Sequence, residues 1–267
     1  MTAITRQQVK QYLQDGVLFP LPALSPNETA SFRSAFETLA SHLGGRPRHR
    51  QLIQPHLCYR WAYDLATHPA ILDVVEALIG PDILVHSTSI FPKYLHEDQI
   101  RWHQDGYYWG LSAPHLISAW VALTNSRVEN GCLRVVAGSH ARQVLPHAQS
   151  STEKTARLSL EIAVEVDEAE ATDVVLKAGQ MSLHHPYIIH GSKPNQTDEL
   201  RLGFAIRFVA AHVKQSLPHH AVVLARGRND HHHFELLPEP PTDDIEKGIL
   251  AQAKIADWID TVPRRFQ

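Results

Sequence analysis

The hydrophobic pattern of this chain changes its period once, near residue 82, and this change restricts the possible folds. Before it, apolar residues recur at the spacing of amphipathic helices. After it, short apolar runs are separated by turn residues, as in strands. No strand–helix–strand alternation follows, which argues against a parallel sheet. The pattern predicts a mainly β fold, a closed barrel or jelly roll, with helices packed outside it.

Three helices are expected before residue 82, at 5–16, 25–45 and 68–80, with a short strand, VLFPL, after the first. Thr5 and Ser25 stand at favoured N-cap positions, and Glu28 completes a capping box with Ser25. Gly16 and Gly80 are suited to ending helices. The N-terminal third is therefore predicted to be mostly helical.

Six strand-like runs follow, at 82–91, 115–125, 132–140, 158–166, 173–192 and 200–213. The run 158–166 has apolar residues of one parity, which predicts a strand with one buried face: Leu158, Leu160, Ile162, Val164 and Val166. Asn130-Gly131 lies between two runs and is typical of a hairpin turn.

A single domain is expected over 1–267, with helical support at 1–81, the jelly-roll core at 82–213 and a C-terminal extension at 214–267. The extension is polar and proline-rich, and we expect a short helix at its end. A lid over the active site is its favoured role. Histidines at 219–220 and 231–233 suggest a second metal site, but consecutive residues do not easily converge on one ion.

Composition limits the class of partner. Lys and Arg number 25 against 28 Asp and Glu in 267 residues, a net charge of −3. No overall field therefore favours nucleic acid or an anionic membrane, and a small-molecule substrate is expected. The start of the chain lacks a signal-peptide core, and two cysteines, Cys58 and Cys132, are too few for a disulfide framework. We therefore expect a cytoplasmic protein, whose oligomeric state the sequence does not fix.

The stretch RWHQDGYYWG, residues 101–110, places His103 and Asp105 two positions apart among aromatic residues. On an extended segment both side chains point to one face and can reach one ion. A chain with 19 histidines is expected to contain about one such pair by chance. A buried histidine beside a turn aspartate therefore explains the pair equally well at this point.

A third ligand favours the metal site. The segment MSLHHPYIIHGSKPNQ offers His184, His185 and His190, and we prefer His190 because it ends an apolar strand just before Gly191-Ser192. Two histidines and one carboxylate on one face of an ion are typical of non-haem Fe(II) oxygenases, although zinc hydrolases use a similar set. Arg201, on the next run, can bind a dicarboxylate co-substrate through a two-pronged contact.

At these residues the chain resembles the phytanoyl-CoA dioxygenase family of iron- and 2-oxoglutarate-dependent oxygenases. The resemblance covers most of residues 8 to 213. The motifs that carry it are VLFP, WHQD, AWVAL, NGCLRVVAGSH, HHPYIIHGS and RLGFAIRF. The motif NGCLRVVAGSH looks like the family's hairpin after the first ligand pair, with Ala137 where a proline is more common. The order and spacing of several weak motifs, rather than any single one, make the resemblance specific.

The resemblance implies a cupin-like double-stranded β-helix with Fe(II) held by His103, Asp105 and His190. It also implies that 2-oxoglutarate is bound by Arg201, with Ser192 and Trp120 beside it. O2 would be the oxidant, with release of CO2 and succinate. Related halogenases replace the aspartate with a small residue, so Asp105 favours hydroxylation of an unactivated C–H bond.

Substrate contacts are harder to predict. The candidates are Tyr107, Tyr108 and Trp109 after the ligand pair, His184 with the parity of His190, and Arg207 with the parity of Arg201. Packing explains the aromatic residues equally well, and Arg207 is equally suited to a structural salt bridge. An acyl-CoA, an amino acid, a phosphonate and a secondary metabolite all remain open.

Two rival functions remain. One is a metal-dependent jelly-roll isomerase or hydrolase that does not use 2-oxoglutarate, against which Arg201 argues. The other is a non-catalytic binding protein on the same fold, against which the complete set of three ligands argues.

Overall fold

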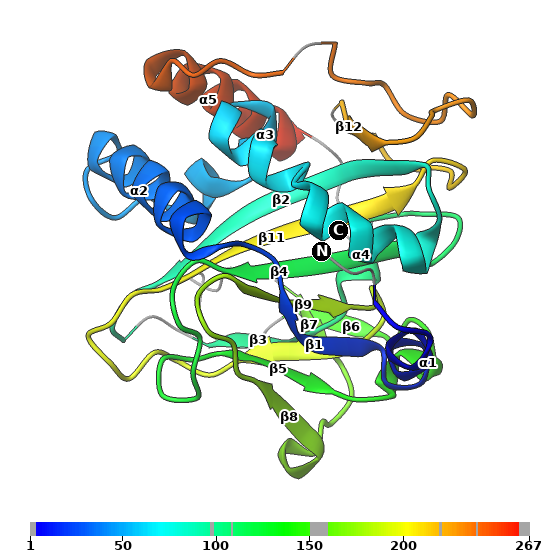
Figure 1. The fold of residues 1–267 in the computed structure, drawn as a ribbon. Helices are drawn as coiled ribbons and strands as arrows, with labels where there is room; N and C mark the ends of the chain where they lie inside the picture. Colours follow the sequence, from blue (N-terminus) through cyan, green and yellow to red (C-terminus); the bar gives the residue numbers. More distant parts are fainter. Residues whose placement is uncertain are drawn as a thin grey trace.

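The computed structural model describes residues 4–96, 99–107, 109–149, 160–218, 221–238 and 240–261 (Figure 1). Its helices are α1 (Arg6–Asp15), α2 (Pro26–His42), α3 (Arg60–Ala66), α4 (Pro69–Ile79) and α5 (Ile245–Thr261). Short 3-10 helices include η1 (His49–Leu52), η2 (Pro55–Leu57), η3 (Asp105–Tyr107), η4 (Ser139–Arg142) and η5 (Glu168–Glu170).

The predicted helix boundaries are confirmed by the caps. Thr5 and Ser25 each form a capping box, with Gln8 and Glu28 respectively. Gly16 ends α1 in the left-handed conformation with φ of 72°. The third predicted helix is α4, whose N-cap is the side chain of His68. α3, between them, was not predicted.

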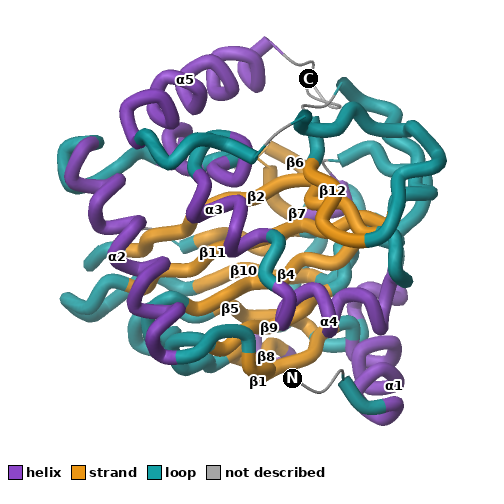
Figure 2. The backbone as a smooth tube through the Cα atoms, turned by 45° about the horizontal axis from the view of Figure 1, so that its top comes forward, coloured by secondary structure: helices purple, strands orange, loops and turns teal. Residues whose placement is uncertain are grey.

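The strands form two main antiparallel sheets, as expected for a jelly roll. The six-stranded sheet has the order β1 (Val17–Pro22), β9 (Gln180–His184), β4 (Leu116–Ala122), β11 (Arg201–Ala210), β2 (Ile83–Lys93) and β12 (Val223–Arg226). The four-stranded sheet has the order β3 (Ile100–His103), β10 (Ile189–Ser192), β5 (Leu133–Val136) and β8 (Ala171–Val174). A separate pair joins β6 (His147–Gln149) to β7 (Leu160–Ile162). Figures 1 and 2 show the two main sheets as separate layers, with α2, α3 and α4 on one side of the six-stranded sheet.

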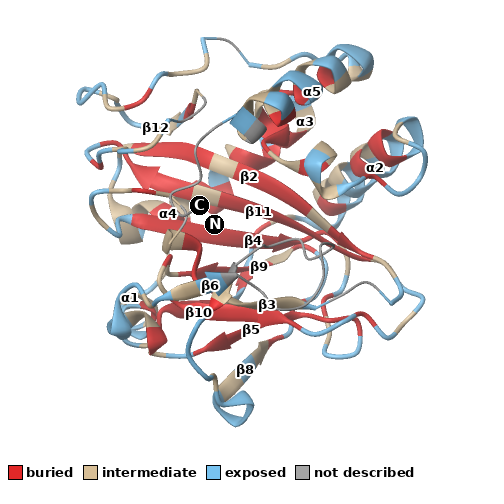
Figure 3. Ribbon diagram, turned by 180° about the vertical axis from the view of Figure 1, so that it is seen from behind, coloured by how far each residue is buried: buried red, intermediate tan, exposed pale blue. Residues whose placement is uncertain are grey.

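The two faces of the six-stranded sheet differ in chemistry, and this difference positions the site. On β11, Leu202, Phe204 and Ile206 belong to the core that the helices cover. The alternate residues Arg201, Ala205 and Arg207 line a cavity on the other face. Because strand side chains alternate between faces, the central strands are buried on both sides (Figure 3).

Three strand predictions differ from the structure. Asn130-Gly131 does not close a hairpin, because β4 belongs to the six-stranded sheet while β5 pairs with β10 and β8 in the other. Gly131 instead lets the chain pass against the backbone of Lys193, where a Cβ atom would lie 2.3 Å from the carbonyl oxygen. The run 173–192 divides into the end of β8, β9 and β10, which lie in different sheets.

In the described part of the run 158–166, the strand is β7, Leu160–Ile162; Ile162 is buried, and Val164, after the strand, is exposed. Leu158 lies outside the described residues. Tertiary packing therefore overrides the alternation here, since β6 is the one strand among the described residues that pairs with β7.

The C-terminal extension contributes to the fold. β12 pairs with β2 at the edge of the six-stranded sheet, and the predicted terminal helix is α5. Within the described part of the chain, no helix has the length and apolar character that a membrane span requires.

Candidate active site

The predicted ligand pair lies at the end of β3. His103 is the last residue of the strand, and Asp105 begins the 3-10 helix η3. The two side chains therefore converge through this turn rather than along an extended segment. Gln104, between them, is fully buried and holds the turn: its amide donates to the carbonyls of Gln143 (2.9 Å) and Tyr187 (2.6 Å).

His190 lies directly across from His103. The two residues are antiparallel partners between β10 and β3, and their ring centroids are 4.0 Å apart. His190 does not end its strand as predicted, because β10 continues to Ser192. This cross-strand register brings together two ligands that are far apart in sequence.

Both imidazoles are fixed in one orientation. Nδ1 of His103 lies 2.8 Å from the carbonyl of Arg101, and Nδ1 of His190 lies 3.0 Å from that of Ile188. Since a carbonyl only accepts, each Nδ1 carries the proton, and each Nε2 lone pair faces the cavity. The two Nε2 atoms lie 3.8 and 3.9 Å from Oδ1 of Asp105.

The two carboxylate oxygens of Asp105 make different contacts. Oδ2 accepts a hydrogen bond from Ser118 Oγ (3.0 Å) and lies 3.4 Å from Nε of Arg207. Oδ1 is left facing the imidazoles. Burial by itself raises the pKa of Asp105, but the charge of Arg207 and the interaction with His184 hold it well below its usual range.

The three groups have the protonation states that a divalent cation needs. Burial lowers the pKa of His103 to about 3 and that of His190 to about 4, so both imidazoles are neutral, while the carboxylate is ionised. Their ligand atoms all lie within 4.8 Å of one another, and in the described part of the chain no other group of three meets this condition. Two imidazoles and one carboxylate fit a non-haem iron site.

Two buried basic residues lie beyond the other end of the cavity, and of these Arg201 lines it. Arg201 on β11 and Lys93 on β2 are directly paired residues, and each is at most 2% exposed. Lys93 Nζ donates to Ser192 Oγ (2.6 Å), and Arg201 Nη1 donates to the carbonyl of Gly131 (2.9 Å). Two buried basic side chains, one of them a planar guanidinium, can bind a carboxylate through charge-assisted contacts, so this end fits the distal carboxylate of 2-oxoglutarate.

Trp120 and Gly203 position the guanidinium of Arg201. Arg201 Cζ lies 5.3 Å from the centroid of the Trp120 ring. A Cβ atom at Gly203 would lie 1.9 Å from Cζ2 of this ring, so only glycine lets the indole lie over β11 at this point.

The cavity between the sheets has a volume of about 210 Å³ and joins both ends. Of the predicted substrate contacts, His184, Trp109 and Arg207 line it. Tyr107 does not, because its ring stacks on that of His147 at 3.9 Å. Tyr108 lies outside the described residues.

Sequence reasoning missed several residues of the site: Lys93, Gln104, Ser118, and the cavity-lining His49, Ser87, Ser89 and Phe91. One signal was available on β2, where the polar residues Ser87, Ser89 and Lys93 share one parity. The other residues carry no local signal, since their partners are distant in sequence.

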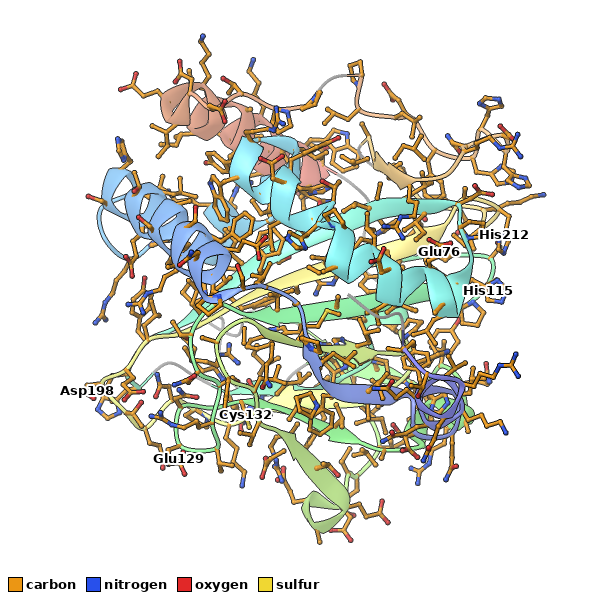
Figure 4. All side chains as sticks on the ribbon, viewed as in Figure 1. Glu76, His115, Glu129, Cys132, Asp198 and His212 are labelled. Atoms are coloured by element: carbon orange, nitrogen blue, oxygen red, sulfur yellow. The ribbon has the colours of Figure 1, made fainter. Side chains whose placement is uncertain are left out.

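The histidines at 231–233, which the structure describes, do not form a second site of this kind. The ring of His231 lies 6.3 Å from that of His212. His212 in turn makes a 2.8 Å contact with His115 (Figure 4). These rings are exposed, and they are not among the described residues that converge at ligand distance. His219 and His220 lie outside the described residues.

Comparison with known proteins identifies the family. A family model described as phytanoyl-CoA dioxygenase matches residues 12–203. The chain belongs to the phytanoyl-CoA dioxygenase family. It is 25% identical to a probable alpha-ketoglutarate-dependent hypophosphite dioxygenase of Stutzerimonas stutzeri, over 77% of this chain and 71% of the relative. It is 27% identical to an ectoine dioxygenase of Nocardia farcinica, over 72% of this chain and 73% of the relative.

A solved structure extends the similarity to the whole fold. The non-haem monooxygenase ThoJ, in its apo form, has a TM-score of 0.80 and 34% sequence identity, over 94% of this chain and 95% of that one. Together with the metal triad, these relatives show an Fe(II)- and 2-oxoglutarate-dependent dioxygenase on a cupin-like fold. The isomerase, hydrolase and binding-protein alternatives are therefore not favoured.

Proposed function

We propose that this phytanoyl-CoA dioxygenase family member hydroxylates an unactivated C–H bond of a small molecule. The observation that carries the proposal is that the complete carboxylate-containing triad shares one cavity with the buried Arg201, beside which Lys93 is buried. When bound, Fe(II) and 2-oxoglutarate supply the oxidation by O2, with release of CO2 and succinate. A hydroxylation is favoured over halogenation because Asp105 occupies the position that halogenases of the family leave open.

We assign the metal to His103, Asp105 and His190. The backbone carbonyls behind the two imidazoles and the Ser118 hydroxyl behind Asp105 hold the ligands in one orientation. Such outer contacts fix the tautomer and the ring plane before the metal arrives. The side-chain amide of Gln104 holds the turn between His103 and Asp105 in place through its two hydrogen bonds to backbone carbonyls.

We assign the distal carboxylate of 2-oxoglutarate to Arg201 and Lys93, with Ser192 as a further hydrogen-bonding group and Trp120 as the wall. The planar guanidinium supplies a two-pronged contact, while the ammonium supplies a point charge. Both are buried, so the contact is protected from solvent screening.

The remaining parts of the proposal concern the chain as a whole. We propose one working domain over 1–267 in the cytoplasm, where Cys58 and Cys132, both free and buried, stay reduced. Part of the extension supports a lid: Leu111 bridges to Gln215, and Ser216 N donates to the carbonyl of Gly110 (3.0 Å), next to Trp109.

The proposal is tested by an anaerobic titration of the metal-free protein with Fe(II) and 2-oxoglutarate, followed by the visible band of the chelate. The wild type should form the band. Asp105→Ala and His190→Ala should form none, and Arg201→Ala should need much more 2-oxoglutarate. Val175→Ala, at an exposed position, serves as the control.

Substrates found by succinate release should gain one oxygen atom, which mass spectrometry of the product detects. A product without that oxygen would contradict hydroxylation, and an unchanged band in Asp105→Ala would contradict the ligand assignment.

A further inference from the structure

Arg207 is the one described arginine or lysine residue that lines the metal end of the cavity. It lies on β11 six residues after Arg201, on the same inner face of the sheet. Its partners across the two neighbouring strands are Ser87 and Ser118. The backbone therefore holds its side chain over the metal ligands, away from Arg201 at the other end.

Only part of the guanidinium is engaged. Nε lies 3.4 Å from Asp105 Oδ2, and Nη1 donates to Ser89 Oγ at 3.2 Å. No described residue accepts a hydrogen bond from Nη2. The side chain is only 12% exposed, so these remaining N–H groups are directed into the cavity rather than into bulk water.

The aromatic rings around Arg207 restrict how a ligand can reach it. The centroids of Phe91 and Trp109 each lie 5.8 Å from Cζ. Both rings also line the cavity, so the space beside the guanidinium is apolar on two sides. A ligand of Nη2 must carry its own acceptor atoms on a body that packs against these rings.

The charges around Arg207 indicate that the ligand group that accepts a hydrogen bond from its Nη2 is an anion. In the protein alone, Asp105 is the counter-charge of Arg207. With Fe(II) and 2-oxoglutarate bound, Asp105 and one carboxylate of 2-oxoglutarate would offset the two charges of the metal, and Arg201 and Lys93 would hold the other carboxylate. The charge of Arg207 is then left without a counter-ion in a buried site, which is unfavourable.

We propose that Arg207 binds an oxyanion of the substrate, and that the substrate is a small carboxylate or related oxyacid. This inference rests on the proposed function, because the charge of Arg207 becomes uncompensated only when the metal and 2-oxoglutarate are bound. The anion occupies the edge of the guanidinium, with the hydroxyls of Ser87 and Ser89 nearby and the apolar body against Phe91 and Trp109. The anchored group then presents a neighbouring C–H bond to the metal.

The cavity size sets the scale of this substrate. Its volume of about 210 Å³ lies below the roughly 300–1,000 Å³ of sites for drug-sized ligands. 2-Oxoglutarate occupies part of this space, so the part of the substrate that enters is a few carbon atoms long.

The test compares matched acids and amides. A series from propionate and propionamide to phenylacetate and phenylacetamide is titrated anaerobically into protein saturated with Fe(II) and 2-oxoglutarate. Binding is read from the shift of the chelate band, which needs no turnover. Acid and amide have nearly the same shape, so their ratio of Kd isolates the charge.

In the wild type, at least one acid should bind at least about tenfold more tightly than its amide, as expected for a charge-assisted two-pronged contact. In Arg207→Met this preference should fall below about twofold, and Arg207→Lys should retain part of it. The matched control is Arg226→Met, whose guanidinium pairs with Asp73 and Glu76 outside the cavity, and which should keep the full preference.

Each other outcome contradicts the inference. If the band forms in the wild type but no acid is preferred over its amide, the anion site is wrong while the proposed function stands. If the preference survives in Arg207→Met and is lost in Lys93→Met, the acids are displacing 2-oxoglutarate, and Arg207 is not the anchor. If no band forms in the wild type, the proposed function fails first and this inference fails with it.

Discussion

Replacing Gly203 by alanine is expected to weaken 2-oxoglutarate binding, although residue 203 itself offers no side chain to the co-substrate. A Cβ atom at this position would lie 1.9 and 2.3 Å from Cζ2 and Cε2 of Trp120. Real carbon atoms do not approach so closely, so the indole must move. Gly203 has no positive φ, so the backbone itself accepts alanine, and the effect is confined to the ring.

The magnitude follows from the contact that the ring makes. The Trp120 ring lies 5.3 Å from Cζ of Arg201 and shields it from solvent. A desolvated cation–π contact contributes about 1–2 kcal/mol, and about 1.4 kcal/mol corresponds to a tenfold change in Kd. The Kd for 2-oxoglutarate should therefore rise about 5- to 30-fold in Gly203→Ala, while the Kd for Fe(II) stays within about twofold.

A double-mutant cycle isolates the cause. The Kd for 2-oxoglutarate is measured from the chelate band in the wild type, Gly203→Ala, Trp120→Ala and the double variant. Because the alanine acts only through the indole, Gly203→Ala should have almost no effect in the Trp120→Ala background. Thermal unfolding checks that each variant is folded, since overpacking costs typically 1–3 kcal/mol of stability.

Two results would refute this reasoning. If Gly203→Ala weakened binding equally in both backgrounds, the alanine would be acting through the backbone of β11 rather than through the ring. If the Kd for 2-oxoglutarate were unchanged in Gly203→Ala, the position of the Trp120 ring would not affect how Arg201 binds 2-oxoglutarate.

Three further predictions concern the two ends of the cavity. Lys93→Met should raise the Kd for 2-oxoglutarate about 10- to 100-fold, because it removes a buried charge-assisted contact, and unchanged binding would exclude Lys93 from that site. Gln104→Ala should weaken Fe(II) binding about 10- to 100-fold in metal titrations, because the turn loses its anchors, whereas an equal loss for Val175→Ala would show a nonspecific effect. The metal-free protein should lose stability to urea as the pH falls from about 6.5 towards 4, because His103 and His190 stay neutral in the folded state while the unfolded chain takes up protons. A His103→Gln, His190→Gln variant should show a shallower loss, and an identical pH profile would contradict this origin.

The sequence by itself determined the fold class and the local structure. The single change of hydrophobic period predicts helices before a jelly roll, and Thr5, Ser25 and Gly16 mark helix ends that the structure confirms. These features are local, because a cap or a periodic face depends on residues within one or two turns. The resemblance carried by several short motifs also selected His103, Asp105, His190 and Arg201, whose roles remain proposals, and the structure brings the first three together.

Only the tertiary structure decided which residues meet. Lys93 and Ser192 are 99 positions apart, and Asp105 and Arg207 are 102 apart, yet both pairs are in contact. In a jelly roll, neighbouring strands are often distant in sequence, so the register between strands sets these contacts. The same reason explains the wrong hairpin at Asn130-Gly131, since a turn signal does not specify that the next strand enters the opposite sheet. The ligand types are thus a property of the sequence, whereas their surroundings depend on strand pairing, because the pairing of β11 with β2 places Lys93 beside Arg201 and the fold brings Arg207 to Asp105.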